Sequence, residues 1–232
     1  MKCAIMQPTY MPWAGYFNLI SQADIFVFLD DVQYEKSSWQ NRNRILLNGQ
    51  VHWITVPSQR LYLGQSIKNI QIDEKRNWRQ KHFKLISQAY AKHPYINELL
   101  NVLEIILEPS IIFLSELNIK IIRAFANSLN LYPKFVVSSE LNICGQRTER
   151  LVKICEYFNC NEYVSPVGAT EYLSKDGDFK DSQIHLSFQE FLPSNYAQHK
   201  QNSFISHLSI LDVLANLGWK KTSQYVTTGT VN

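Results

Sequence analysis

Two adjacent carboxylates, Asp30 and Asp31, follow an uninterrupted apolar run at residues 25–29. Such a run, bounded by polar residues, is typical of a buried parallel strand, so both carboxylates are expected at a strand's carboxyl end. There a carboxylate could act as a general base or bind a divalent metal. Adjacent residues of an extended chain point to opposite sides, so one of the pair is expected to face a site. A helix cap or a turn is the equally open alternative for each.

The stretch QPTYMPWAGYF, residues 7–17, combines rigid and aromatic residues between a first strand and a first helix. Its two prolines stiffen the loop, and its rings could stack on a base or a sugar. Its glycine permits close approach of a ligand to a helix start, where free N–H groups attract anions. The alternative for any one ring is a rigid loop packed by aromatics. The substrate-binding residues predicted here are Gln7, Tyr10, Trp13, Gly15 and Tyr16.

A third polar group precedes a predicted hairpin and contains Trp39, Asn41, Arg42 and Arg44. If a strand starts there, both arginines lie on one side of it, a spacing suited to a phosphate or a carboxylate. These four residues are therefore predicted to bind substrate, with an exposed strand face as the alternative.

Among the six histidines, His199 is the best catalytic candidate; His82, on the buried face of a predicted helix, and His93, before Pro94, are expected to be structural. The histidines show no metal-ligand spacing, and the four cysteines form no CxxC pair. No metal site is predicted, and the cysteines are expected to be buried thiols.

Length and charge narrow the class of protein. At 232 residues the chain can bury a substantial core and is expected to form one domain, 1–232. A net charge of +3 without an arginine-rich stripe does not indicate a nucleic-acid partner, but it suits a small anionic ligand. The apolar runs are too short for a membrane span and no signal peptide is recognised, so a cytoplasmic protein is expected.

The order of elements predicts an α/β fold with a mainly parallel, Rossmann-like sheet, an inserted β-hairpin and a central helical block. Strands are expected at 3–6, 25–29, 134–137, 162–165 and 184–188, with a helix at 15–22, a hairpin turning at 48–49 and a helical block at 74–130. The third helix of that block is expected to start at 108–110. A last helix, 208–217, is expected to end at Gly218, with a flexible tail at 219–232. Ligands of such sheets bind at the carboxyl ends of strands, here after Gln7, Asp30 and Ser165.

Several motifs together resemble the WbqC-like family: QPTYMPWAGYF, ADIFVFLDDVQYEKSSWQNRNRI, WITVP, TERLVKICEYFNCNEYVSP and NYAQHKQNSFISHLSILDVLANLG. The resemblance covers almost the whole chain. The family usually ends the strand-to-loop segment in Ser-Gly, whereas this chain has Ser165-Pro166-Val167-Gly168. Carried over, the family pattern picks out Gln7, Pro8, Tyr10, Pro12, Trp13, Gly15, Tyr16, Asp30, Asp31, Trp39, Asn41, Arg42, Trp53, Pro57, Tyr196, Gln198, Ser209 and Asp212.

The resemblance implies a transferase of O-antigen (lipopolysaccharide) or other surface-polysaccharide biosynthesis. It implies acyl or aminoacyl transfer to the amine of a nucleotide-linked sugar, with that sugar and an activated acyl donor as ligands. It also admits other polysaccharide-biosynthesis proteins as partners. Asp30 or Asp31 would deprotonate the amine, which requires a raised pKa that a neighbouring carboxylate could supply.

A second resemblance is architectural, to nucleotidylyltransferases that carry a His-x-Gly-His loop after the first strand. Trp13 and Tyr16 stand where those histidines would be, so nucleotide binding is expected to survive better than nucleotidyl transfer. Two alternatives therefore stay open: a nucleotidylyltransferase-like enzyme, and a non-catalytic partner of the polysaccharide pathway.

Overall fold

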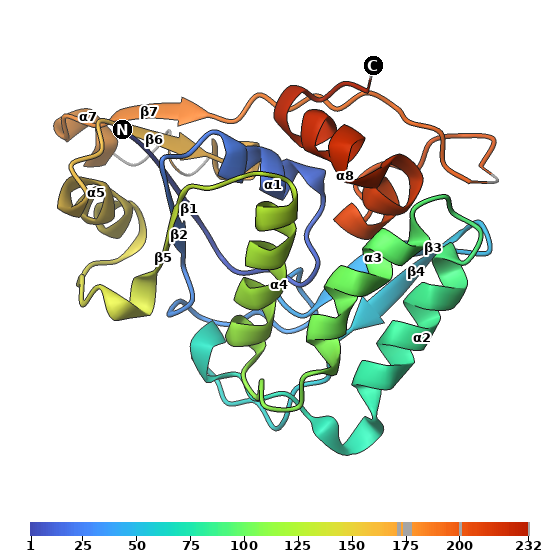
Figure 1. Cartoon of the computed structure of the whole chain (residues 1–232). Helices are drawn as coiled ribbons and strands as arrows, with labels where there is room; N and C mark the ends of the chain where they lie inside the picture. Colours follow the sequence, from blue (N-terminus) through green and yellow to red (C-terminus); the bar gives the residue numbers. More distant parts are fainter. Residues whose placement is uncertain (171–172, 174–177, 200, 232) are drawn as a thin grey trace.

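The computed structural model describes residues 1–170, 173, 178–199 and 201–231 (Figure 1). Its central feature is a five-stranded sheet in the order β5-β2-β1-β6-β7, and all four pairings are parallel. The strands are β1 (Lys2–Met6), β2 (Ile25–Phe28), β5 (Lys134–Val137), β6 (Glu162–Ser165) and β7 (His185–Phe188). Because β1 is followed by β2 on one side and later by β6 on the other, the strand order reverses at β1. The predicted α/β fold with a mainly parallel sheet is confirmed.

Alternate residues of the strands feed two hydrophobic clusters, one on each face of the sheet. Ala4 and Phe26 belong to the larger cluster, which includes residues of α1 (Ala14–Ser21), α4 (Leu114–Ser128) and α8 (Ile210–Thr228). Cys3 and Ile25 belong to the smaller cluster, where α5 (Arg147–Tyr157) and α7 (Asp178–Asp181) cover the opposite face. Helices therefore protect both faces, as a parallel sheet requires.

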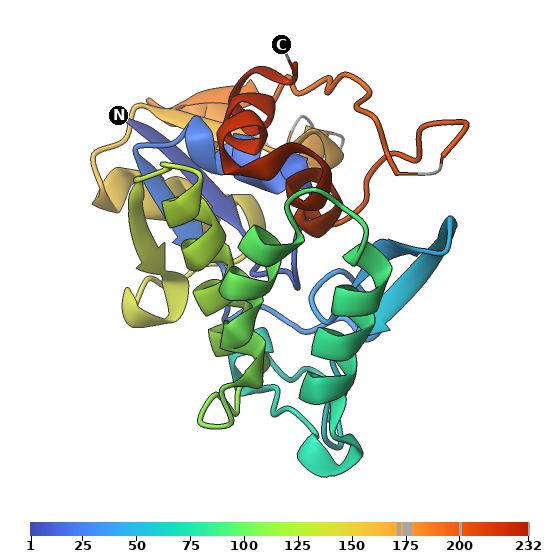
Figure 2. The same cartoon turned by 45° about the vertical axis from the view of Figure 1, so that its right-hand side comes forward.

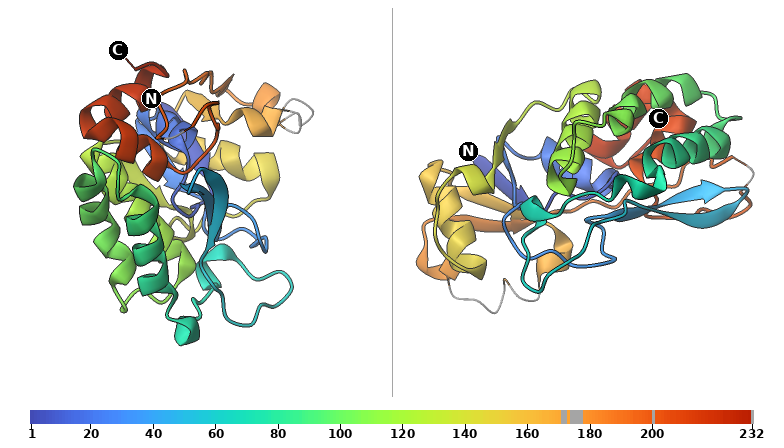
Figure 3. Two further views of the ribbon diagram at one scale, coloured as in Figure 1. Left: turned by 90° about the vertical axis from the view of Figure 1, so that its right-hand side faces the viewer. Right: turned by 90° about the horizontal axis from the view of Figure 1, so that it is seen from below.

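The predicted hairpin is present as β3 (Arg42–Leu47) and β4 (Gln50–Thr55), which pair in antiparallel register. Its turn residues Asn48 and Gly49 both have positive φ, 51° and 80°, as a two-residue hairpin turn of this kind requires. The hairpin is not part of the parallel sheet and extends away from it (Figure 3).

The predicted helical block contains α2 (Trp78–Tyr90), α3 (Ile96–Leu103) and α4, and α2 lies beside the hairpin strand β3 (Figure 2). The third helix begins at Leu114 and not at 108–110, so that prediction was wrong. The segment before it is held extended, because the carbonyl of Ile112 accepts from the N–H of Ile72. This pairing keeps the segment out of the helix.

The prediction of a flexible tail at 219–232 was also wrong, although residue 232 lies outside the described residues. Helical geometry is interrupted at Gly218, with φ 69° and ψ 171°, but the chain resumes as helix to Thr228. The N–H of Trp219 donates to Glu98 Oε2 at 3.1 Å, which supplies a partner at the start of the second half. Burial of Tyr225 and Val226 then anchors that half to the core.

None of the helices in the described ranges is long and apolar enough to cross a membrane. All four cysteines are free thiols, three of them buried. That the chain forms a single domain stays a prediction.

Candidate functional site

A cavity of about 680 Å³ lies at the carboxyl ends of β1 and β6, where the strand order reverses. We call it the switch cavity. Loops that leave neighbouring strands toward opposite faces open a crevice at such a point, and this is where doubly wound sheets bind ligands. Its walls come from both loops and from the segment between β7 and α8. Lining residues include Gln7, Trp13, Gly15, Tyr16, Trp39, Pro166, Gly168, Gln189 and His207.

Residues 7–17 divide into a wall of this cavity and a buried anchor. Tyr10 belongs to the anchor: it is fully buried, and its hydroxyl is 3.0 Å from His82 Nδ1. Burial lowers the pKa of His82 to about 4, so the ring is neutral near pH 7. Tyr10 does not line the cavity, so the structure gives it no contact with a ligand there.

Gly15 lines the switch cavity at the start of α1, and that it binds substrate stays a prediction. A Cβ at this position would lie 2.1 Å from a ring carbon of Trp13, so the glycine lets the indole lie on the start of α1. The backbone carbonyl of Gly15 accepts from Gln189 Nε2 at 2.7 Å. Tyr16 is buried beside it and donates from its hydroxyl to the carbonyl of Gln7. Gly15 therefore shapes the cavity wall by admitting Trp13.

A cluster of two tryptophans and two arginines continues from the rim of the cavity. Trp39 lines the cavity and lies 5.3 Å, between ring centroids, from Trp53. The guanidinium of Arg42 lies 4.3 Å from the Trp53 ring, and that of Arg44 lies 5.6 Å from the Trp39 ring. Although these are aromatic residues, 47% of Trp39 and 41% of Trp53 is exposed. We call these four residues the Trp–Arg cluster; exposed rings beside cations suit a planar, anionic ligand.

Asp30 and Asp31 lie after β2 but do not line the switch cavity. Asp30 is buried and accepts from the hydroxyl of Ser138 and from the N–H and hydroxyl of Ser139, at 2.9–3.1 Å. Asp31 pairs with Arg150. Burial alone would raise the pKa of Asp31, but hydrogen bonds from Arg150 and Ser138 outweigh it and hold that pKa below its ordinary value. The raised pKa expected for a base at Asp31 is therefore not found.

The remaining predicted residues fall into two groups. Asn41, directly before β3, and Ser165, the last residue of β6, are buried, and Asn41 Nδ2 donates to the carbonyl of Val56. Tyr196 and Gln198 instead converge on Asp212, where Oδ2 accepts from the Tyr196 hydroxyl at 2.6 Å and from Gln198 Nε2 at 3.2 Å.

His199 is exposed, and its ring contacts His93 at 5.0 Å and not the switch cavity. The imidazole that lines the cavity belongs to His207, which sequence reasoning missed. Its ring lies 4.6 Å from Trp13, and Arg44 Nη2 donates to its carbonyl at 2.9 Å. His207 also has φ 57°, a conformation that no local sequence pattern indicated.

No group of three or more His, Cys, Asp or Glu side chains that could hold a metal occurs in the described part of the chain. Among the described residues that line the switch cavity, His207 is the only histidine, and none is Asp, Glu, Lys or Arg. Imidazole is the side chain best suited to exchange a proton near neutral pH. His207 is therefore the residue of this lining whose side chain is best suited to exchange a proton with a ligand.

These features define an α/β protein with a cavity at the switch point of a parallel sheet. The chain belongs to the WbqC-like protein family, which matches residues 7–224. It is 34% identical over 221 residues to an uncharacterized protein, Rv1507c, of Mycobacterium tuberculosis, and the match covers 94% of each chain. No solved structure matches the chain significantly.

Proposed function

We propose that this protein binds a nucleotide-linked amino sugar in the switch cavity and transfers an acyl or aminoacyl group to its amine, in surface-polysaccharide biosynthesis. The observation that carries the proposal is the continuity between the cavity and the Trp–Arg cluster, which share Trp39. A deep cavity beside an exposed cationic and aromatic surface suits a ligand with a ring at one end and phosphates at the other.

The Trp–Arg cluster is assigned to the base and the diphosphate. Its two tryptophan rings offer faces for stacking, each worth about 1–3 kcal/mol for a bound base. The guanidinium groups of Arg42 and Arg44 lie 4.3 and 5.6 Å from these two rings. A diphosphate would supply acceptors for such donors, and guanidinium groups bind phosphate oxygens in pairs. The sugar would then extend past Trp39 into the switch cavity.

The transfer requires a base at the amine. The amine nitrogen attacks the carbonyl carbon of the activated acyl donor, a C–N bond forms, and the leaving group departs with its electron pair. The proton released from nitrogen passes to the imidazole of His207, which replaces Asp30 and Asp31 in this role because it lines the cavity. His207 can then return the proton to the leaving group.

Calorimetric titration with UDP-, dTDP- and GDP-linked amino sugars tests the binding step. The double variant Trp39→Ala/Arg42→Gln should lose at least tenfold in affinity for the sugar that binds. The matched control is Arg60→Gln/Tyr62→Ala, because Arg60 lies over the exposed Tyr62 ring in a pair remote from the cavity lining. Equal affinity in both double variants, or no binding of any sugar in the panel, would sink the proposal.

One observation favours a second candidate, nucleotidyl transfer. The loop that follows β1 lacks the two histidines of nucleotidylyltransferases, yet the fold brings His207 against Trp13 in that loop. This enzyme would release pyrophosphate from a nucleoside triphosphate with magnesium, and His207→Gln would abolish the release. Absence of pyrophosphate with all common triphosphates would remove this candidate and leave the transferase. A protein that is only a non-catalytic partner would show neither acyl transfer nor pyrophosphate release.

A further inference from the structure

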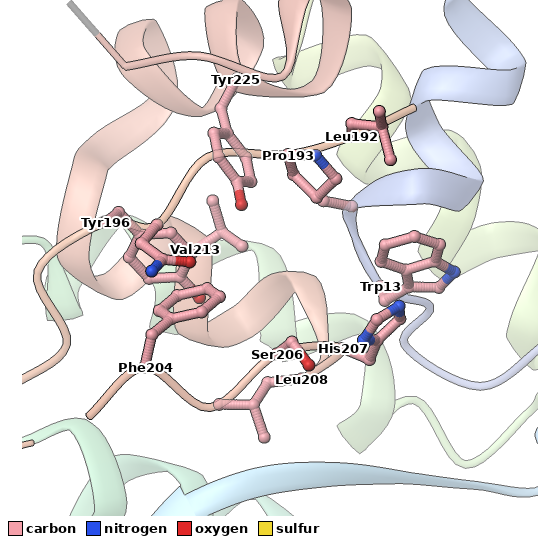
Figure 4. Close-up of a pocket in the computed structure, with 12 residues that line it drawn as sticks. Trp13, Leu192, Pro193, Tyr196, Phe204, Ser206, His207, Leu208, Val213 and Tyr225 are labelled. Carbon is pink, nitrogen blue, oxygen red and sulfur yellow. The ribbon is translucent and has the colours of Figure 1, made fainter. Parts of the chain in front are cut away.

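A second, smaller pocket shares lining residues with the switch cavity. Figure 4 shows this second pocket. We call it the side pocket. It has a volume of about 230 Å³, and none of its described lining side chains is Asp, Glu, Lys or Arg. Its lining residues are Trp13, Ala14, Leu192, Pro193, Asn195, Tyr196, Phe204, Ser206, His207, Leu208, Val213 and Tyr225. The lining is largely apolar and aromatic, which favours an uncharged group over an ionic one.

Three residues line both the side pocket and the switch cavity, namely Trp13, Leu192 and His207. The rings of Trp13 and His207 lie 4.6 Å apart at an interplanar angle of 36°, and Figure 4 shows them together at one end of the side pocket. This ring pair is therefore a common wall. A group bound in the side pocket and a group bound in the switch cavity would therefore meet at the imidazole of His207.

The side pocket is built from side chains that are held in place. The Tyr196 ring lies 5.0 Å from Phe204 and 5.4 Å from Tyr225, both edge to face. The hydroxyl of Tyr196 donates to the buried carboxylate of Asp212, and that of Tyr225 donates to the carbonyl of Ser194. Each phenol hydroxyl thus has a hydrogen-bond partner, and the two rings contribute apolar surface to the pocket lining.

We infer that the side pocket binds the acyl group of the second substrate, a small uncharged group carried on an activated donor. The inference rests on the proposed function, which places the acceptor amine in the switch cavity. A cavity of about 150 Å³ accepts benzene, so the side pocket has room for about six to nine heavy atoms. The acyl carbonyl would lie at the common wall, beside His207, where the acceptor amine reaches it. Longer chains exceed the pocket.

N-acetylcysteamine thioesters that carry acyl chains of 2, 4, 6 and 12 carbons are the probes for this site. Their binding is measured by calorimetry with the full-length protein, with and without a saturating nucleotide-linked sugar. Affinity should rise about fourfold for each methylene buried, up to six carbons. It should rise no further at twelve carbons, and the sugar should not displace the thioester. Affinity independent of chain length, or competition between the two ligands, would overturn the inference.

Ser206→Trp fills the side pocket from its exposed rim, whereas Ser203→Trp adds the same bulk on the same loop outside the pocket. Ser206→Trp should weaken hexanoyl thioester binding at least tenfold and leave nucleotide-sugar binding unchanged. Val213→Phe, which fills the pocket from α8, should do the same. If the Ser206 and Ser203 variants bind the thioester equally, the inference fails while the proposed function stands. If Ser206→Trp instead loses nucleotide-sugar binding and keeps thioester binding, that result would count against the proposed function.

Discussion

Replacing Asp212 with asparagine tests whether a buried carboxylate beneath the side pocket gains a proton near pH 6. Asp212 is fully buried in α8. Its Oδ2 accepts from Tyr196 and Gln198. Burial raises the pKa of Asp212 to about 6, although hydrogen bonds from Tyr196, Gln198 and Tyr90 favour the charged form.

The raised pKa of Asp212 determines whether the protein gains or loses stability as the pH rises. The ordinary value for this carboxyl is 3.8, so between about pH 4 and pH 6 the folded protein binds more protons at Asp212 than the unfolded chain does. Stability contributed by this group is therefore complete below pH 4 and is lost as the pH rises through 6. At about 1.4 kcal/mol per pH unit, the difference amounts to about 3 kcal/mol.

Asparagine keeps an oxygen that accepts from Tyr196 and removes the charge. Urea unfolding followed by tryptophan fluorescence, at intervals from pH 4 to pH 7.5, measures the free energy of unfolding for both proteins. Relative to its value at pH 4, the wild type should lose about 3 kcal/mol more than Asp212→Asn by pH 7.5. Other titrating groups are common to both proteins and cancel in this comparison.

Asp181→Asn is the control, because it makes the same substitution at an exposed carboxylate. Parallel profiles for Asp212→Asn and the wild type would refute the reasoning. They would mean that the carboxylate stays charged in the fold or that water reaches it.

Three further predictions concern residues outside that network. Asp30→Asn should lower the free energy of unfolding by roughly 1–3 kcal/mol, because the buried hydroxyl of Ser138 and the half-buried donors of Ser139 lose a charged acceptor. It should leave nucleotide-sugar affinity unchanged; lost affinity with full stability would restore Asp30 to the site. Gly15→Ala should displace the Trp13 indole and weaken nucleotide-sugar binding at least tenfold, while the circular dichroism spectrum stays that of the native protein. Unchanged nucleotide-sugar binding would refute this role for the glycine. Arg79→Met should cost roughly 3 to 5 kcal/mol in urea unfolding, because a buried guanidinium satisfies two backbone carbonyls. A loss below 1 kcal/mol would contradict it.

Much of the fold could be predicted because its signals are local. Apolar runs bounded by polar residues located all five parallel strands, and the Asn48-Gly49 pair located the hairpin turn. The wrong predictions concern segments whose conformation depends on hydrogen-bond partners far away in the sequence. The segment before α4 stays extended because it pairs with Ile72, and the helix resumes after Gly218 because Glu98 accepts from its first N–H. Neither partner is close in sequence.

The site was predicted less completely, for the same physical reason. The switch-point rule located the cavity and identified Gln7, Trp13 and Tyr16, whose neighbours are set by the strand order. It also pointed to Asp30. However, Ser138 and Ser139, which lie in a short helical turn directly after β5, donate hydrogen bonds to that carboxylate. His207 had no signal, because it lies on an irregular segment that only the completed fold brings to Trp13.

The loop after β1 shows why the cavity depends on the whole chain. A proline-rich loop without regular structure buries carbonyl groups that need donors. Asn118 of α4 donates to the carbonyl of Pro8, Asn43 of the hairpin donates to those of Tyr10 and Met11, and Ser209 at the start of α8 also donates to Met11.

Three elements far apart in sequence thus fix one loop, and the loop in turn fixes Trp13, the wall common to both compartments. The helical block and the hairpin are therefore parts of the site even where they do not contact a ligand. A ligand that orders the switch cavity should consequently protect backbone amides of α4 and β3 from hydrogen exchange, as well as those of the loop itself.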